Sequence, residues 1–248
     1  MKIIQITDIH IDREEERPFD IDVRTNFDRI LSAALDTKPD HLIFSGDLCC
    51  RVGEMPIYEW IRERLEEQPL GFDLLAGNHD DAKMMAKCFA REHLLTNGEL
   101  YYAKKLDKYH SIFLDSSKGY HSDNQLKWLK RQLLQAQGEL LVFMHHPPVK
   151  AGVPFMDNKY PLKDMDKVQE LLLSYSDNIT VFCGHYHVER SIRLKNILVY
   201  ITPSCFFQID ANYEDFKVDH HRIAFREIDL SHQMIRSHVR YFEGTHSH

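Results

Sequence analysis

Residues 1–10, MKIIQITDIH, join an apolar run from Ile3 to Ile6 to two polar residues, Asp8 and His10, that follow it almost at once. A short run rich in isoleucine is typical of a buried β-strand. Aspartate and histidine are common metal ligands, and here both would lie just past the end of the strand. The segment therefore favours a sheet protein with a polar site at the carboxyl ends of its strands.

Further apolar runs of the same kind alternate along the chain with helical patterns. Strands that alternate with helices predict βαβ units and an α/β fold with a largely parallel sheet core. Ser122 and Gln125 form a candidate capping box for one of the helices. The expected strands cover residues 3–6, 42–44, 72–75, 112–114, 140–143, 179–182 and 197–201. The expected helices cover residues 23–35, 57–65, 81–93, 126–134 and 168–173.

The end of the chain has a different pattern. From Arg222 onward, two apolar stretches with a turn between them predict an antiparallel hairpin that closes a sheet. No linker long enough to separate domains interrupts residues 1–242, so we expect a single domain there. Residues 243–248 are expected to form a frayed tail.

The composition argues against several classes of protein. The chain has 38 acidic and 31 basic residues, and its net charge of −7 provides no broad positive surface for long DNA or RNA. No apolar run is long enough to span a membrane, and residues 1–6 lack the pattern of a secretory signal. The 5 cysteines are scattered, which suits reduced thiols. These features predict a soluble, cytoplasmic protein.

Residues of metal-ligand type recur where the expected strands end. Because the carboxyl ends of the strands in an open α/β sheet face a common crevice, these segments are expected to converge. The candidates are Asp8 and His10 after the first strand, Asp47 after the second, Asn78, His79 and Asp80 after the third, His145 and His146 after a later strand, and His185 and His187 after the next.

Each of these segments also has a purely structural explanation. An aspartate can cap a helix, an asparagine can occupy a turn, and a histidine can be hydrogen-bonded in the core. The whole set is harder to explain in this way, because burying so many polar groups costs free energy unless a partner compensates them. A bound metal is the natural partner.

The types of ligand limit which metals the centre could bind. Imidazole and carboxylate groups without thiolate suit zinc, iron, manganese, cobalt or nickel. If the backbone stays extended, Asp8 and His10 lie on the same side of the chain, as do His185 and His187. The ligands are too many for one tetrahedral ion, whereas two ions could share them with Asp47 as the bridge. Two-metal sites hold the attacking and leaving oxygens of an in-line displacement, so the residues predict phosphoester hydrolysis.

The motifs D-x-H, G-D, G-N-H-D, H and G-H-x-H, in this order from Asp8 to His187, resemble those of the calcineurin-like metallophosphoesterases. The resemblance implies a four-layer α/β/β/α sandwich in which two mixed sheets pack face to face. It also implies two divalent or trivalent transition-metal ions, with iron, manganese or zinc expected.

The resemblance assigns a role to each candidate residue. His79 is implied as the proton donor to the leaving oxygen, with Asp80 tuning or orienting it, and Asn78 and His79 as contacts of the substrate. His145 is preferred to His146 as a ligand because it directly follows the apolar strand. One ion would be held by Asp8, His10, Asp47 and His187, and the other by Asp47, Asn78, His145 and His185.

Within the family, the chain looks most like the class III cyclic-nucleotide phosphodiesterases (the bacterial CpdA or Icc type) and the related glycerophosphodiesterases. The supporting segments are residues 77–80, 125–129, 143–148 and 202–208. Phosphoprotein phosphatases carry an arginine before G-N-H-E, whereas Ala76 stands here, and the acidic balance does not favour a DNA-repair nuclease. Residues 49–50 and 163–164 differ from the pattern of these relatives. The differences bear on which substrate is bound and not on the metal chemistry.

Three functions are consistent with these residues. The leading hypothesis is a phosphodiesterase for a small substrate, with 3′,5′-cyclic AMP as the first candidate. The second is hydrolysis of glycerophosphodiesters or other small diesters. A scaffold that binds metal or nucleotide without turnover is the non-enzyme alternative, which the intact ligand set disfavours. Arg51, Lys150 and Lys159 could contact a phosphate, although solvated loop charges are the favoured explanation. The sequence does not indicate the oligomeric state.

Overall fold

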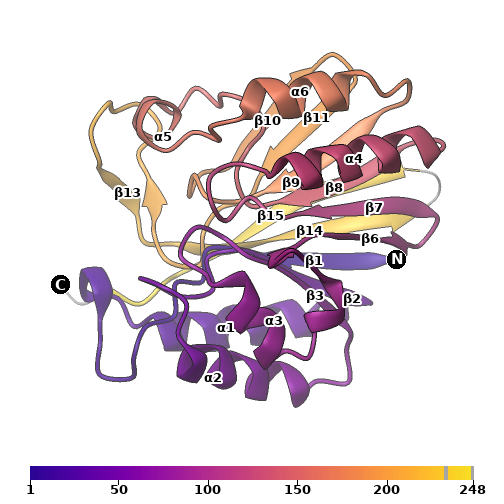
Figure 1. Ribbon diagram of the computed structural model, residues 1–248. Helices are drawn as coiled ribbons and strands as arrows, with labels where there is room; N and C mark the ends of the chain where they lie inside the picture. The colour runs from indigo at the N-terminus through magenta and orange to yellow at the C-terminus, as the bar shows by residue number, and fades with distance from the viewer. Residues whose placement is uncertain (232–233, 247–248) are drawn as a thin grey trace.

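The structure of the protein is a computed structural model that describes residues 1–231 and 234–246. Two large β-sheets pack face to face at its centre, and helices cover the outer face of each sheet (Figure 1). The expected four-layer α/β/β/α sandwich with two mixed sheets is confirmed. The helices beside the first sheet are α1 (Val23–Asp36), α2 (Met55–Glu66) and α3 (Ala82–Cys88), and those beside the second are α4 (Asp123–Gln135) and α6 (Met165–Leu173).

The first sheet has a parallel centre. Its three strands from the N-terminal part of the chain run parallel, and the C-terminal hairpin extends the sheet in the antiparallel sense. The central strand is buried on both faces, as its isoleucine-rich sequence predicts. The order of strands is β15 (Met234–Phe242), β14 (Ile223–Ser231), β1 (Lys2–Ile6), β2 (His41–Ser45) and β3 (Phe72–Leu75).

The second sheet is also mixed. Four of its strands are parallel to one another, and an antiparallel strand lies at each edge. The order is β10 (Arg190–Leu194), β11 (Ile197–Ile201), β9 (Ile179–Cys183), β8 (Leu140–Met144), β7 (Tyr109–Leu114) and β6 (Tyr102–Leu106). The smaller elements are the pairs β4 (Leu95–Thr96) with β5 (Glu99–Leu100) and β12 (Gln208–Ile209) with β13 (Val218–His220), the short helix α5 (Pro154–Lys159), and two 3₁₀ turns, η1 (Pro18–Asp20) and η2 (Glu92–Leu94).

A row of stacked aromatic rings crosses the second sheet, one ring from each of five neighbouring strands. Successive ring centroids lie between 4.6 and 5.5 Å apart, and the ring planes are within 18° of parallel. Such stacks contribute beyond the apolar area that they bury. The rings of this aromatic ladder belong to Tyr102, Phe113, Phe143, Phe182 and Tyr200.

The ladder faces the first sheet and meets it at both ends. At one end, the hydroxyl of Tyr102 donates a hydrogen bond to Asp73 of β3, 3.2 Å away. At the other end, the guanidinium of Arg226 from β14 lies over the ring of Tyr200, 4.9 Å from its centroid. The two sheets are therefore joined by polar contacts at the margins of an apolar interface.

Most of the expected elements are present, including the closing hairpin. The helix expected over residues 81–93 is too long, because α3 ends at Cys88 and Ala90 turns into the left-handed region with φ 52°. The capping box is only half formed: Ser122 accepts from the amide of Gln125, whose own side chain bonds Asp115 instead. The edge strands β6 and β10 and the helix α5 were not expected.

The C-terminal residues return to the N-terminal half of the molecule. The hydroxyl of Thr245 donates to the backbone oxygen of Asp22, and the amide of Thr245 donates to the side chain of Asn26. Residues 247–248 of the expected frayed tail lie outside the described residues. Within the described residues, none of the helices combines the length and apolarity needed to cross a membrane.

Candidate metal centre

The candidate ligands follow β1, β2 and β3 of one sheet and β8 and β9 of the other, where these strands end. Both sheets therefore contribute loops to one polar centre at a shared edge of the sandwich. Seven residues offer ligand atoms to clusters whose atoms lie within 4.8 Å of one another: Asp8, His10, Asp47, His79, His145, His185 and His187.

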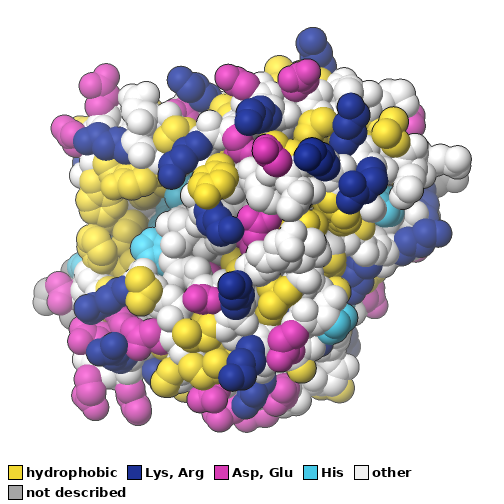
Figure 2. All heavy atoms as spheres, in the orientation of Figure 1, with side chains coloured by type: hydrophobic (Ala, Val, Ile, Leu, Met, Phe, Trp, Pro, Cys, Tyr) yellow, Lys and Arg dark blue, Asp and Glu magenta, His cyan; other side chains and the backbone are white. Residues whose placement is uncertain are grey.

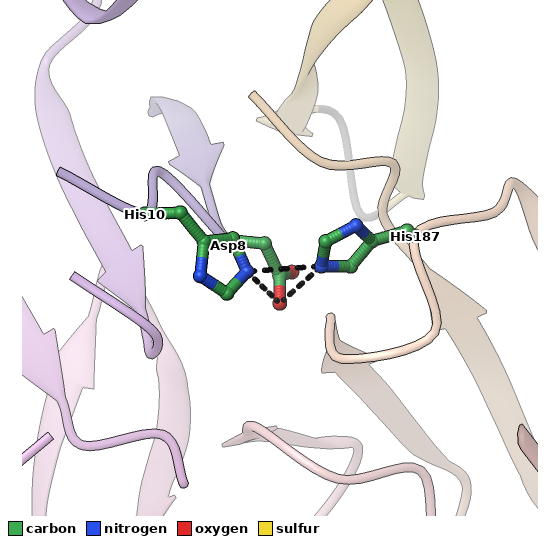
Figure 3. A group of neighbouring side chains, drawn as sticks. All are labelled: Asp8, His10 and His187. Atoms are coloured by element: carbon green, nitrogen blue, oxygen red, sulfur yellow. Dashed lines mark hydrogen bonds and ion pairs between the residues drawn. The ribbon is translucent and has the colours of Figure 1, made fainter. Parts of the chain in front are cut away.

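The first cluster joins Asp8 and His10 to His187, which comes from the opposite sheet. Figure 3 shows the three side chains pointing toward one another across the gap between their loops. His187 Nε2 lies 3.4 Å from Asp8 Oδ1, and the Nε2 atoms of His10 and His187 are 3.0 Å apart. His10 Nε2 lies 4.0 Å from Asp8 Oδ1. Three potential ligand atoms thus surround one small space.

The second cluster consists of Asp47, His145 and His185. His145 Nε2 lies 3.2 Å from Asp47 Oδ2 and 3.8 Å from Asp8 Oδ1. His10 Nε2 lies 3.8 Å from the same oxygen of Asp47, which therefore stands between the two clusters. A carboxylate in this position is placed to bridge two ions.

Backbone carbonyls fix which ring nitrogen of three histidines carries the proton. Nδ1 of His145 donates to the carbonyl of Ser45, and Nδ1 of His187 donates to that of Phe207. Nε2 of His185 donates to the carbonyl of Tyr160. When such a ring is neutral, its other nitrogen presents a lone pair to the centre, and hydrogen bonds of this kind orient histidine ligands in metal sites.

This arrangement tests whether the residues fit a metal. Nε2 of His145 is buried and has no hydrogen-bond partner, although a carboxylate oxygen is close by. The Nε2 atoms of His10 and His187 face each other at 3.0 Å, a separation at which one ring must donate to the other unless a cation lies between them. A cation between these nitrogens and the carboxylates satisfies all of them, so the donor set fits metal ions.

The electrostatics of the centre also suit cations. Burial lowers the pKa of His10 to about 3 and the pKa of His185 to about 4, so both rings are neutral and ready to coordinate near pH 7. Burial would also lower the pKa of His145, but the carboxylates of Asp47 and Asp8 outweigh it and raise that pKa to about 9. Carboxylates that favour the protonated form of a buried histidine also favour a bound cation at the same place.

The backbone at the centre departs from the expected extended form. Asp8, His10, His185 and His187 have φ values of 52°, 47°, 67° and 51°, in the left-handed region, as does Asp47 at 52°. The expectation of an extended backbone was therefore wrong. Instead the chain turns sharply after each strand, and the amides of Asp8 and His10 donate to the carbonyls of Gly46 and Asp47. Aspartate and histidine tolerate such turns better than most residues, and the turns aim their side chains inward.

Two glycines allow these loops to approach closely. A Cβ on Gly77 would overlap the carboxylate and the amide nitrogen of Asp47. A Cβ on Gly184 would overlap the side chains of Thr7 and Asp8. Neither position can therefore carry a side chain without displacing a candidate ligand.

Asp80 links two of the loops. Its carboxylate accepts hydrogen bonds from the amides of Leu48, Cys49 and Gly77 and from the hydroxyl of Tyr58. Burial raises the pKa of Asp80 to about 6, with a further contribution from the charge of Asp47. No hydrogen bond to His79 is among those described for Asp80, whose partners are loop amides and the hydroxyl of Tyr58.

His79 and Asn78 lie at the opening of the centre. Nδ1 of His79 donates to the carbonyl of Arg51 at 3.1 Å, and Nε2 lies 4.0 Å from Asp47 Oδ2. His79 is close enough to form a further cluster with His10 and Asp47. Asn78 is exposed and lines the same pocket.

The neighbouring candidates have other partners. Nδ1 of His146 pairs with the hydroxyl of Ser116, which holds its ring outside the two clusters and leaves His145 as the inner residue. The guanidinium of Arg51 is engaged by Asp12 and Glu16, as expected for a loop charge.

One feature of the centre was not predicted from the sequence, namely a group of aromatic side chains around its opening. A pocket of about 480 Å³ contains candidate ligands on one side and aromatic rings on the other. The only available signal was the consecutive pair Phe206 and Phe207, which lies within the 202–208 segment noted above. The aromatic residues are Phe19, Phe155, Tyr160, Phe206, Phe207 and Phe216.

Comparisons with known proteins agree with this geometry. A protein of Fibrobacter succinogenes named a probable cyclic nucleotide phosphodiesterase is 35% identical over 99% of this chain and 95% of its own. A protein of Arcobacter nitrofigilis named a probable glycerophosphodiester phosphodiesterase is 29% identical over 84% of this chain and 80% of its own.

Among solved structures, a dimetal phosphatase from Danio rerio has the same fold, with a TM-score of 0.68 at 11% identity over 98% of this chain and 99% of that chain. The family model for calcineurin-like phosphoesterases matches residues 1–189, which include every candidate ligand. The chain therefore belongs to the calcineurin-like phosphoesterase family and is a metal-dependent phosphoester hydrolase.

Proposed function

We propose that the protein hydrolyses small phosphodiesters at a two-metal centre, with 3′,5′-cyclic AMP as the first candidate substrate. The observation that carries the proposal is the position of Asp47 between two clusters of ligand atoms, which suits a bridged pair of ions. The substrate is suggested by the Fibrobacter succinogenes protein, whose name refers to cyclic nucleotides and whose similarity covers nearly the whole chain.

The proposed centre divides its ligands between two ions. When bound, the ions would supply charge stabilisation for the phosphoryl oxygens and a nucleophile at neutral pH. Asn78 is added to the second set because it follows β3 and lines the pocket. One ion is assigned to Asp8, His10, Asp47 and His187, and the other to Asp47, Asn78, His145 and His185.

His79 is the proposed proton donor to the leaving oxygen, and Asn78 and His79 are proposed to contact the substrate. The carbonyl of Arg51 accepts a hydrogen bond from Nδ1, so Nε2, 4.0 Å from Asp47 Oδ2, is the nitrogen left for the substrate. A protonated Nε2 there can donate to an alkoxide as it leaves phosphorus. Asp80 supports this position indirectly, because it holds the loop of residues 77–80 against the loop that follows Asp47.

Hydrolysis of glycerophosphodiesters is the second candidate. It is suggested by the name of the Arcobacter nitrofigilis relative, which covers less of this chain at lower identity. The two candidates share the metal chemistry and differ in the group that the pocket must accept.

A substrate panel on metal-restored enzyme tests the proposal. The protein is stripped with a chelator, reloaded with manganese, iron or zinc, and assayed with cyclic AMP, cyclic GMP, a glycerophosphodiester and a phosphate monoester. Metal-dependent turnover of the cyclic nucleotides is expected. If only an activated nitrophenyl ester reacts, the cyclic-nucleotide assignment is wrong.

We also propose a cytoplasmic location. All five cysteines are free thiols in the structure, including the buried Cys49, Cys88, Cys183 and Cys205. Free thiols suit a reducing compartment. Fractionation of cells that express the protein tests this location.

A further inference from the structure

The aromatic side chains beside the metal centre form one continuous surface, here called the aromatic wall. It is contributed by segments far apart in the sequence: the 3₁₀ turn η1, the helix α5 and its C-terminal end, the loop after β11, and the loop before β13. Figure 2 shows hydrophobic side chains gathered beside histidines on the side of the molecule where Figure 1 places α5 and β13. The wall consists of Phe19, Phe155, Tyr160, Phe206, Phe207 and Phe216.

Three residues of the wall are unusually exposed. Phe19, Tyr160 and Phe216 expose 53%, 52% and 43% of their surface, although large hydrophobic side chains are normally covered. Phe19 also has a φ of 54°, a left-handed conformation that is rare for a bulky residue. Its ring centroid is 4.9 Å from that of Phe207 and 5.8 Å from that of Phe216. An exposed ring held in a strained backbone indicates a ligand contact more than a contribution to folding.

The wall continues directly into the metal centre. The ring of Phe206 lies 5.2 Å from that of His10, and the ring of Phe207 lies 5.2 Å from that of His187. The carbonyl of Phe207 also accepts the hydrogen bond that orients His187. A substrate whose phosphorus sits between the clusters can therefore place one of its ester groups against the wall.

The chemistry of the wall selects the kind of group that it can hold. Apart from the residues of the metal centre, the polar side chains among the described residues that line this pocket are Cys50 and Tyr160. Burial raises the pKa of the Cys50 thiol to about 12, so it is a neutral, weak hydrogen-bonding group. A glycerol or amine head group would lose its water there without gaining comparable partners, whereas a flat ring can stack on the phenylalanine faces.

We infer that the aromatic wall binds the nucleobase of the substrate by its face, and so favours nucleotides over base-free diesters without distinguishing adenine from guanine. This inference rests on the proposed function, because it concerns the ester group of a phosphodiester held at the metal centre. The lack of discrimination follows from the small number of polar groups that could read the edge of a base. Base recognition by aromatic stacking is tolerant of sequence for the same reason.

Binding of two matched monophosphates to the metal-loaded protein tests the inference without catalysis. AMP and ribose 5-phosphate carry the same phosphate and sugar, and only AMP carries a base. Since stacking on an aromatic side chain is worth about 1–3 kcal/mol per base, calorimetry should find AMP binding roughly 5- to 150-fold tighter. GMP should bind like AMP.

Exposed positions of the wall provide the variants. Phe19→Ala and Phe216→Ala should remove most of the advantage of AMP and leave the affinity for ribose 5-phosphate unchanged, whereas Phe19→Trp should keep it. Tyr120→Ala is the matched control, because Tyr120 exposes 44% of its surface and does not line this pocket. Circular dichroism verifies that each variant is folded.

Several results would overturn the inference. Equal affinities of AMP and ribose 5-phosphate for the wild type would do so, as would an equal weakening of both by Phe19→Ala. A large preference between AMP and GMP would contradict the lack of base discrimination. Octyl phosphate binding more tightly than AMP, with the same dependence on Phe19, would assign the wall to an alkyl chain. Failure of the proposed function is a separate result, namely no turnover of cyclic AMP by metal-loaded enzyme that still binds AMP through the wall.

Discussion

At the scale of single residues, the proposed roles of His79 and Asp47 differ in whether the side chain holds a metal. His79 lies at the opening of the pocket with 36% of its side chain exposed, and its Nδ1 is fixed by the carbonyl of Arg51. Asp47 is almost fully buried between both clusters of ligand atoms. Removal of either side chain should therefore impair the enzyme through a different step.

His79→Ala should retain its metals and lose catalysis selectively. A ribose or glycerol alkoxide needs a proton as it leaves phosphorus, whereas nitrophenolate does not, and general acid catalysis is typically worth about 10²–10⁴-fold. We expect a loss of that order in kcat/KM for a cyclic or alkyl diester and a much smaller loss for a nitrophenyl diester. Steady-state kinetics with both substrates on metal-loaded protein measures the difference. An equal loss for both would instead assign His79 to positioning of the phosphate.

Asp47→Ala should be the most damaging change among the ligands, because the carboxylate lies within 3.8 Å of His10 Nε2 and 3.2 Å of His145 Nε2. Elemental analysis should find about two transition-metal ions per chain in the wild type and a large loss in the variant. Asn78→Ala, the matched comparison, should weaken mainly one ion. The bridging assignment is withdrawn if Asp47→Ala keeps the metal content and activity of the wild type.

At the scale of secondary-structure elements, Asp73 connects three strands. It is 6% exposed, and its carboxylate accepts hydrogen bonds from His41 of β2 at 2.7 Å, Lys104 of β6 at 2.9 Å and Tyr102 of β6 at 3.2 Å. Burial alone would raise the pKa of Asp73, but the hydrogen bonds from His41 and Lys104 outweigh it and lower that pKa below the usual value of 3.8. The ionised carboxylate therefore stabilises the contact between the two sheets.

Asp73→Asn should be less stable than the wild type by about 2 kcal/mol at pH 7, because a charged acceptor is lost from buried hydrogen bonds. Since the pKa of Asp73 is lower in the folded protein than in the unfolded chain, this advantage of the wild type is fully present above the unfolded pKa of 3.8. It should shrink as the pH falls through the folded pKa. Urea denaturation of both proteins between pH 7 and pH 3 measures the difference. Asp28→Asn, which alters an exposed ion pair with Arg64, is the control and should have little effect.

The elements also explain which structural features could be predicted from the sequence. The strands with continuous apolar runs were predictable because they are buried on both faces, as β1 and β8 are. The edge strands β6 and β10 were not, because exposed charged residues such as Lys105 and Arg193 interrupt their apolar residues and resemble loop sequence. Edge strands are commonly protected by such charges.

Some features of the candidate site could likewise be predicted from the sequence, and others could not. The ligand motifs were predictable because they directly follow recognisable strands, and the structure brings Asp8 and His187 together as expected. Their left-handed backbone was not predictable, because it depends on hydrogen bonds between loops, such as that from Asp8 to Gly46. The aromatic wall was missed because Phe19 and Phe216 belong to segments without a motif, and only the folded chain places them beside the metal centre.

At the scale of the whole molecule, Arg226 holds the two sheets together at the side opposite Asp73. Its side chain comes from β14, is 2% exposed, and donates to Thr202, to the carbonyl of Ile201 and to Ser237. Burial lowers the pKa of Arg226, yet the guanidinium remains charged and lies over the ring of Tyr200. One side chain thus satisfies acceptors from both sheets.

Arg226→Met should cost on the order of 3 kcal/mol in unfolding free energy, because it leaves the buried acceptors at Ile201 and Thr202 without their donor. Arg226→Lys should recover only part of the loss, since a single ammonium cannot reproduce the geometry of the guanidinium. Denaturant titration measures both values. If the variants keep the metal content of the wild type, the loss of stability arises at the sheet interface. If Arg226→Met has the denaturation midpoint of the wild type, the interface does not depend on this residue.

The pairing of His10 with His187, 177 positions apart in the sequence, has a consequence for the kinetics of folding. A pair of ligands this distant cannot meet until both sheets have formed and docked, so the complete metal centre arises late, after the rate-limiting transition state. Interactions absent from the transition state slow unfolding and leave the folding rate nearly unchanged. Stopped-flow measurements with and without manganese should therefore find the unfolding arm of the chevron displaced and the refolding arm preserved. The metals would then slow the unfolding of a structure that forms without them. A refolding arm accelerated by manganese would mean instead that the ions help the chain to fold.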